Sequence, residues 1–275
     1  MMSDPARPLL ALVGPTAVGK TALSLALAAR FNGEIVSADS RLFYRGLDIG
    51  TAKPTADERA AAPHHLIDIC NPNETLSLGQ YQRLARAAID GVLARGRLPI
   101  LVGGTGQYVM AVVEGWGVPE VAPRPALRAA LERLGGAEAA RWLAALDPTA
   151  AERIDPRNVR RVVRALEVTL VSGRPISELQ RKTPPPYDVR LVGLQRDRAT
   201  LYARIDARVD EMMAAGLLDE VRRLHDAGYA DEPPLSGLGY RQLLAHLRGE
   251  TTLGEAVTRI KFETHRFARQ QATWF

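Results

Sequence analysis

The sequence predicts an α/β fold, in which a parallel sheet is flanked by helices and interrupted by an all-helical insertion. Three observations lead to this prediction. Strand and helix patterns alternate up to Gly115, which is typical of a parallel sheet covered by helices. A phosphate-binding pattern occupies the first turn from strand to helix. Helical patterns alone follow over residues 126–180, before the chain returns to an apolar strand.

The first strand is predicted at residues 9–13 and the first helix at residues 21–31. The segment between them, GPTAVGKT, matches G-x-x-x-x-G-K-[ST]. In such a loop the backbone N–H groups and the helix dipole face an anion, the lysine adds a positive charge, and the hydroxyl of Thr21 can hold Mg²⁺. We therefore predict a P-loop NTPase-like core that binds a diphosphate or triphosphate through Gly14, Pro15, Thr16, Ala17, Val18, Gly19, Lys20 and Thr21.

Later elements bring polar residues to the same edge of the sheet. Strands are predicted at residues 34–38 and 99–102, with an amphipathic helix at residues 78–95 between them. Lys20, Asp39 and Thr105 each follow the carboxyl end of a strand, which is where ligands bind in parallel sheets. Asp39 is the acidic residue placed to hold Mg²⁺ through water or to act as a general base. An ordinary turn or helix-cap aspartate is the alternative.

The pattern changes after Gly115. Helices are predicted from about residue 126 to residue 180, a proline-rich break follows at residues 184–186, and a strand is predicted at residues 189–194. The tail, residues 199–270, is again mostly helical. We predict a catalytic core of residues 1–117 and 188–275, and a helical insertion domain of residues 118–187.

Basic residues gather on two of the predicted helices. A solvated helix face is the plain interpretation of both. However, like charges at three- and four-residue spacing repel, and a face that carries them suits a phosphate backbone. Over residues 155–170 the arginines lie opposite the apolar side chains, and over residues 259–269 a single acid, Glu263, stands among the basic residues. The residues are Arg157, Arg160, Arg161 and Arg164 in the first helix, and Arg259, Lys261, Arg266 and Arg269 in the second.

Composition limits the class of protein. The chain has 275 residues, a formal net charge of +5 and 5% aromatic residues, so extended stacking on single-stranded nucleic acid is not expected. The single cysteine, Cys70, excludes an internal disulfide and a CxxC metal site, which fits a reducing cytoplasm, and we expect it in the core. Residues 1–8 are too short and polar for a signal peptide, and no apolar run approaches the ~20 residues of a membrane span. We therefore expect a cytoplasmic protein with no membrane partner.

Seven segments resemble the tRNA dimethylallyltransferases (tRNA isopentenyltransferases) of bacterial type. In chain order they are GPTAVGKT, SADSRLFYRGLDIGTAKP, APHHLIDI, LVGGTGQY, RRVVRALEV, RIDARVDEMMAAGLLDEV and GLGYRQ. The resemblance covers residues 14–275. It implies transfer of a dimethylallyl group from dimethylallyl diphosphate to N6 of the adenosine adjacent to the anticodon, tRNA position 37. The products would be N6-dimethylallyladenosine and diphosphate. The P-loop would then hold the diphosphate leaving group, with Mg²⁺ near Thr21 as cofactor.

The resemblance also assigns roles to residues. Asp39 is similar to the family's general base, while Lys20, Thr105 and Arg208 match positions that stabilise the departing diphosphate. For Arg208 the alternative is a surface salt bridge with a neighbouring acid on its own helix. Tyr240 is either a stacking partner of the substrate or a tyrosine at the edge of the core. Positions matching tRNA contacts are Asp39, Ser40, Arg41, Leu42, Thr105, Arg128, Arg160, Arg161, Arg164, Gly239, Tyr240 and Arg241.

This sequence departs from the family pattern in places. Arg41-Leu42 occupies the region where the family usually has the base-reading Gln, Gln107 replaces a usual Leu, and the chain ends at residue 275, where relatives commonly continue. Three other functions remain open: an adenylate dimethylallyltransferase acting on free AMP, ADP or ATP, a small-molecule P-loop kinase, and a nucleotide-switched RNA-binding module without chemistry. The basic insertion argues against the adenylate dimethylallyltransferase, because a free mononucleotide does not need an extended basic surface. We expect a monomer.

Overall fold

The structure is a computed structural model, and it describes residues 7–274. The chain divides into two compact units. One unit consists of the chain up to Val113 together with the chain from Pro186 onward, and the other is Glu114–Pro185. No helix among the described residues is long and apolar enough to cross a membrane.

The first unit is built on a parallel sheet, which has five strands within the described chain. The strand order is β3-β2-β4-β1-β5, and every pairing is parallel. This confirms the predicted α/β class. The two-residue strand β3 was missed, because two residues are too few for an alternating pattern. The strands are β1 Pro8–Val13, β2 Gly33–Ser37, β3 His64–His65, β4 Leu98–Gly103 and β5 Asp188–Gly193.

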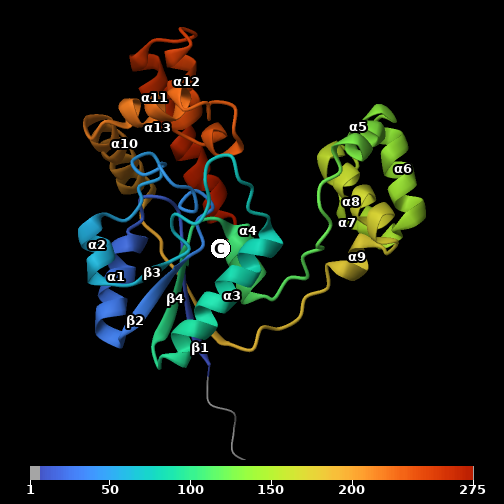
Figure 1. Ribbon diagram of the computed structural model, residues 1–275, viewed down its shortest axis with the longest axis horizontal. Coiled ribbons are helices and arrows are strands. Elements are labelled where there is room, and N and C mark those ends of the chain that lie inside the picture. Colours follow the sequence, from blue (N-terminus) through green and yellow to red (C-terminus); the bar gives the residue numbers. More distant parts are fainter. Residues whose placement is uncertain (1–6, 275) are drawn as a thin grey trace, which may run out of the picture. The chain divides into compact units, whose positions relative to one another are not determined.

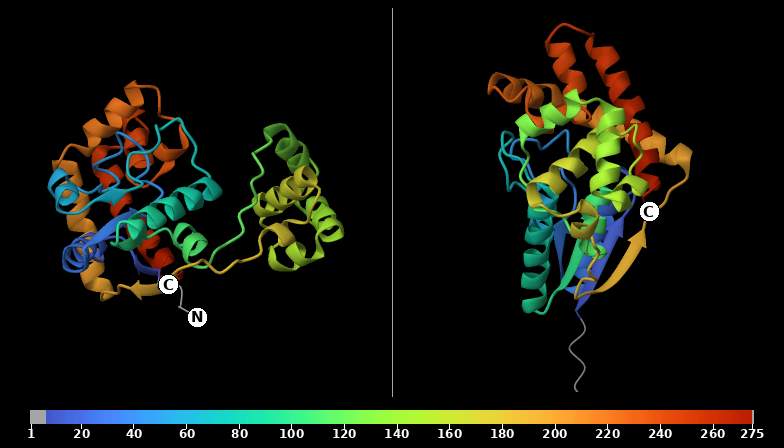
Figure 2. Two further views of the ribbon diagram at one scale, coloured as in Figure 1. Left: turned by 60° about the horizontal axis from the view of Figure 1, so that its bottom comes forward. Right: turned by 90° about the vertical axis from the view of Figure 1, so that its right-hand side faces the viewer.

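Helices cover both faces of this sheet (Figures 1 and 2). On one face α1, Lys20–Phe31, packs against the apolar side chains of β2 and β4. On the other face α3, Leu78–Ala94, and α4, Gly106–Val113, bury a stripe of apolar side chains against β1, β2 and β4. Ser77 begins α3 with a capping box, in which its hydroxyl and the Gln80 side chain satisfy each other's backbone N–H groups. The short helix α2, Ala56–Ala61, lies in the connection from β2 to β3.

The last third of the chain forms a helical layer beyond the carboxyl ends of the strands (Figure 1). Apolar residues of these helices join the main core cluster with residues of β1, β2 and β4. The long helix α13 packs against both α10 and α12. The elements are α10 Arg198–Ala214, α11 Leu217–Asp226, the 3-10 helix η1 Pro233–Ser236, α12 Tyr240–Leu247 and α13 Leu253–Ala272.

The second unit is helical and has its own core. Helix α8, Val159–Ser172, lies at its centre, with the middle of the helix almost fully buried. Asn158 caps its first turn, and Gly173 ends it in the left-handed conformation with φ 68°. The other helices are α5 Pro125–Arg133, α6 Gly136–Leu146, α7 Pro148–Arg153 and α9 Ile176–Leu179.

The carboxyl ends of β2 and β4 approach each other unusually closely. A Cβ atom on Gly103 would lie 2.4 Å from the carbonyl oxygen of Ala38. Only glycine therefore fits here without moving a backbone. Because Ala38 precedes Asp39 and Gly103 leads into the loop that carries Thr105, this contact brings the two loops together at the sheet edge.

Replacing Gly103 by alanine is expected to lower the free energy of unfolding by about 1–3 kcal/mol, because the added methyl group must displace the backbone at Ala38. Gly193→Ala is the matched control. Both glycines end a strand and both pair with Val13, one from each side, but a Cβ on Gly193 would meet nothing within 4 Å. Urea unfolding of the two variants measures the difference. Equal stabilities would show that the Ala38 contact imposes no constraint.

Candidate active site

The phosphate loop between β1 and α1 is held in shape by residues from late in the chain. The backbone N–H of Thr16 donates to Oε1 of Gln271 at 2.8 Å, and Nε of Arg204 donates to the carbonyl of Ala17 at 2.9 Å. These partners lie on α13 and α10. The loop pattern was predicted from the sequence, but these supports were not.

Lys20 lies against its own loop. Its Nζ donates to the carbonyls of Gly14 and Pro15, both at 2.8 Å. Burial lowers the pKa of Lys20 to about 8. The negative charge of Asp39 partly opposes this shift, and the positive charge of Arg208 adds to it. At neutral pH the ammonium group is therefore mostly charged.

Asp39 follows β2 and contributes to the same region. One carboxylate oxygen, Oδ1, accepts the N–H of Arg41 at 3.0 Å. This hydrogen bond is typical of a turn aspartate, which was the alternative to a functional role for Asp39. For Oδ2 no hydrogen bond is found within residues 7–274. Asp39 lines two cavities.

Arg208 is brought to the site by α10. The sequence left open a salt bridge with Asp206, Asp210 or Glu211, but in the described part of the chain Arg208 has no ion pair. Asp206 instead lies 2.8 Å from His265, and Asp210 lies 2.7 Å from Lys261. Burial lowers the pKa of Arg208, against the attraction of Asp39. An arginine that is desolvated and unpaired beside a phosphate loop is suited to an anionic ligand.

Two cavities meet at these residues. The phosphate cavity, about 1000 Å³, is lined by Lys20, Thr21 and Arg204. The second cavity, about 660 Å³, is called the apolar cavity here after the apolar side chains that α10 and α13 contribute to it. Its lining also includes Thr105 and charged residues, among them Arg41, Arg241 and Glu263. The phosphate loop thus borders one cavity, and apolar and charged side chains together border the other. Both cavities share Thr16, Ala17, Asp39, Thr51, Ala52, Arg208, Met212 and Phe267.

The loop after β2 is fixed by a buried carboxylate that sequence reasoning missed. Glu220, on α11 and 1% exposed, accepts the backbone N–H groups of Asp48, Ile49 and Gly50 at 2.8–3.1 Å. An acid on an amphipathic helix gives no sign in the sequence that it is buried. Three N–H donors satisfy the charge, so the loop and the helix stabilise each other.

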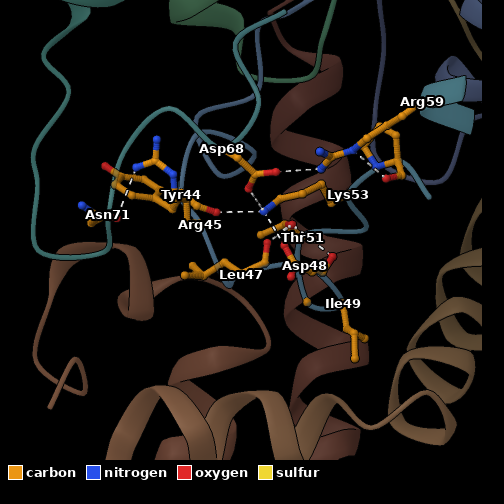
Figure 3. A network of polar contacts seen from close by, with 12 residues as sticks. Tyr44, Arg45, Leu47, Asp48, Ile49, Thr51, Lys53, Arg59, Asp68 and Asn71 are labelled. Atoms are coloured by element: carbon orange, nitrogen blue, oxygen red, sulfur yellow. Dashed lines mark hydrogen bonds and ion pairs between the residues drawn. The ribbon is translucent and has the colours of Figure 1, made fainter. Parts of the chain in front are cut away.

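Lys53 fixes the other end of this loop (Figure 3). Its buried ammonium group donates to the carbonyl of Tyr44 at 2.9 Å and to the carboxylate of Asp68 at 2.6 Å, and it also pairs with Asp48. Arg59 donates to the other oxygen of Asp68 at 2.9 Å. Each carboxylate thus has a cationic partner, and these contacts fasten the loop next to Thr51 and Ala52, which border both cavities.

Several predicted tRNA contacts are already engaged inside the protein. Tyr240 is 1% exposed, and its hydroxyl donates to Glu220 at 2.7 Å, which is the core-edge alternative. Burial beside Glu220 raises the pKa of Tyr240 well above its ordinary value. The guanidinium of Arg41 donates to the carbonyl of Pro234 at 2.8 Å, and Arg241 pairs with Glu263. Ser40, Leu42 and Gly239 line the cavities.

In the second unit, the arginine face is less unbalanced in charge than the sequence indicated. Arg128 and Arg164 both bind the buried carboxylate of Glu167, and exposed Arg157 pairs with its neighbour Asp155. Burial works to raise the pKa of Glu167, but hydrogen bonds from Arg128, from the backbone N–H of Arg124 and from Arg164 hold it at about 2. Arg160 and Arg161 remain exposed, with no ion pair among the residues described.

No group of three His, Cys, Asp or Glu side chains suited to a metal ion exists within the described chain. The hydroxyl of Thr21 borders the phosphate cavity together with Asp39. A metal ion bound here would therefore take few ligands from the protein.

Comparison with known proteins gives consistent results. A family model described as IPP transferase matches residues 42–275. A tRNA dimethylallyltransferase from Roseiflexus sp. (strain RS-1) is 60% identical over 273 residues, which is 98% of this chain and 90% of that protein. One from Chloroflexus aggregans is 56% identical over 272 residues, which is 97% of this chain and 92% of that protein.

Solved structures agree with these matches. A full-length tRNA isopentenylpyrophosphate transferase from Bacillus halodurans has a TM-score of 0.73 and 44% identity, covering 98% of this chain and 86% of that one. A eukaryotic dimethylallyltransferase described as acting on tRNA has a TM-score of 0.86 and 28% identity, covering 97% of this chain and 69% of that one.

The lowered pKa of Lys20 predicts how anion binding depends on pH. Binding of inorganic diphosphate needs the protonated ammonium, so the affinity should fall by up to about tenfold per pH unit as the pH rises above 8. Lys20→Arg should remove this fall, because arginine stays charged. Calorimetric titration of the unaltered protein and of Lys20→Arg with diphosphate, at pH 7 to 9.5, gives a dissociation constant for each. The ratio of the two constants is compared across pH, because the protonation of diphosphate itself affects both proteins equally. A ratio independent of pH would contradict the prediction.

Proposed function

Because this chain belongs to the tRNA dimethylallyltransferase family, we propose that its two cavities catalyse prenyl transfer to tRNA. The protein is a transferase that prenylates adenosine 37 of tRNA. We further propose that it acts in the cytoplasm as a monomer. The dimethylallyl group comes from dimethylallyl diphosphate, and the products are N6-dimethylallyladenosine and diphosphate.

One observation carries the assignment of the site: Asp39 and Arg208 lie where the phosphate cavity and the apolar cavity share their walls. The donor diphosphate would occupy the phosphate cavity against Lys20. The adenine, turned out of the anticodon loop, would occupy the apolar cavity. The allylic carbon then lies between the two, which is the requirement for direct transfer.

The reaction breaks the bond between the allylic carbon and the diphosphate oxygen and forms a bond from that carbon to N6. The exocyclic amine is a poor nucleophile, and Asp39 accepts the proton that it loses. Negative charge builds up on the departing oxygen, where Lys20, Arg208 and Thr105 stabilise it together with the loop N–H groups beyond Thr16. The Thr16 N–H is already occupied by Gln271.

The site fits Mg²⁺ in a limited way. Thr21 and Asp39 border the phosphate cavity, and Mg²⁺ commonly takes one or two protein ligands together with phosphate oxygens and water. We propose that Thr21 would hold the ion at this cavity. Bound Mg²⁺ would neutralise charge on the leaving diphosphate.

A direct assay tests the function. The protein is incubated with dimethylallyl diphosphate, Mg²⁺ and unmodified tRNA bearing an adenosine next to the anticodon, and the RNA is then digested and analysed by mass spectrometry. One prenyl group should appear on that adenosine. A product on free AMP alone would point to an adenylate dimethylallyltransferase, and ATP consumption without prenyl transfer would point to a kinase.

Asp39→Asn should lower the rate of transfer by about 100-fold or more, because the amide cannot accept the proton. Its affinity for tRNA should be retained. Single-turnover rates and filter binding, compared with the unaltered protein, separate the two effects. Full transfer activity in this variant would remove Asp39 as the base.

The exposed arginines of α8 predict the salt dependence of tRNA binding. The double variant Arg160→Ala/Arg161→Ala should weaken binding and flatten the slope of log affinity against log salt by about 0.7–0.9 for each phosphate that the protein no longer neutralises. A matched control, Arg30→Ala/Arg223→Ala, removes the same charge from exposed positions of the first unit that line neither cavity. Equal slopes for the two double variants would show that Arg160 and Arg161 do not contact tRNA and that this face of α8 is only a solvated surface.

A further inference from the structure

Near the end of α13, one buried side chain joins two loops of the site. Gln271 is 5% exposed. Its Oε1 accepts the N–H of Thr16 in the phosphate loop at 2.8 Å, and its Nε2 donates to the carbonyl of Gly104 at 2.9 Å. The two partners lie 255 and 167 residues away in the sequence. The orientation of the amide follows from the chemistry, since the N–H must donate and the carbonyl must accept.

On both sides of Thr105, the loop that carries it contacts residues at the end of α13 or just beyond it. A Cβ on Gly104 would lie 2.3 Å from Nε2 of Gln271, and a Cβ on Gly106 would lie 2.4 Å from the ring of Trp274. Both glycines are therefore in close contact with this part of the chain. Thr105, between them, lines the apolar cavity.

These contacts occur just beyond the paired part of the sheet. The register of β1 and β4 ends at Val13 opposite Gly103, so no ladder hydrogen bonds hold the loops that follow. Gln271 supplies the direct hydrogen-bonded link between Thr16 and Gly104. Arg204 supports the phosphate loop only, at Ala17.

We propose that Gln271 is a positioning residue, which sets the distance between the phosphate loop and Thr105 and so aligns the diphosphate with the groups that stabilise its departure. This inference rests on the proposed function. A glutamine is required because the link needs an acceptor and a donor at once. Methionine offers a similar shape without either, and an ionised glutamate can only accept.

Two variants test the proposal. Gln271→Met should lower kcat for prenyl transfer roughly 10- to 100-fold, since small displacements of reacting groups are costly. The KM for dimethylallyl diphosphate should change by less than about threefold, because Lys20 and the remaining loop N–H groups are unaltered. Rates are measured well below the melting midpoint of each protein. The second variant, Gln271→Glu, adds a charge, and Gln195→Glu is its matched control. Gln195 is exposed and lines neither cavity, so Gln195→Glu should behave like the unaltered protein.

Gln271→Glu gives a signature that a purely structural role would not produce. Protonated, the introduced carboxyl group can both accept from Thr16 and donate to Gly104, but ionised it cannot donate. The ratio of its kcat to that of the unaltered protein should therefore rise as the pH falls. A ratio independent of pH, or a Gln271→Met variant with unchanged kcat, would overturn the proposal.

A readout without prenyl transfer keeps the inference separate from the function. Hydrogen exchange should be faster in Gln271→Met than in the unaltered protein, in peptides covering both residues 14–21 and residues 103–108. Unchanged protection in both peptides would overturn the positioning role even if the enzyme is active. If the unaltered protein shows no prenyl transfer but Gln271→Met still loses protection in both peptides, the proposed function is contradicted. The link that Gln271 makes between the two loops is then still supported.

Discussion

The site depends on buried polar side chains that arrive from the last third of the chain and satisfy backbone groups at the carboxyl edge of the sheet. Glu220 takes three N–H groups of the loop after β2, and Gln271 joins the two loops that follow β1 and β4. Backbone groups beyond a strand end have no ladder partner, and burying them unpaired is costly. The helical layer therefore supplies the hydrogen-bond partners that the sheet cannot provide at this edge.

Charge at the site is arranged in the same way. Asp68, which fixes the loop after β2, binds Lys53 and Arg59. In the second unit, away from this site's residues in the chain, Glu167 binds Arg128 and Arg164 in the same way. Lys20 rests on backbone carbonyls instead, and Arg208 has no ion pair within residues 7–274. Lys20 and Arg208, which both border the phosphate cavity, are thus cations without a carboxylate partner in the described part of the chain. Desolvation makes them more sensitive to an incoming diphosphate than surface arginines would be.

Much of the framework was predictable from local pattern. The phosphate loop, four of the strands and the change to helices after Gly115 each have a signal within a short window, because apolar periodicity and turn residues act locally. The predicted strand ends placed Asp39 and Thr105 at the edge of the sheet, and the resemblance of whole segments then pointed to Arg208. Glu220 and Gln271 were missed, since a polar residue on a helix looks solvated until its distant partner is known. The charged face of α8 was overestimated for the same reason, because Glu167 lies beneath it.

The sequence by itself determined the class of fold, the presence of a phosphate loop and the family, and through the family the reaction. Only the tertiary structure decided which of the candidate groups are free to act. It engaged Tyr240, Arg41 and Arg128 in internal hydrogen bonds and left Arg208 unpaired at the junction of the two cavities. The physical reason is that hydrogen bonding and desolvation depend on neighbours far away in the chain. A motif specifies the side chain, and packing specifies what that side chain has left to bind.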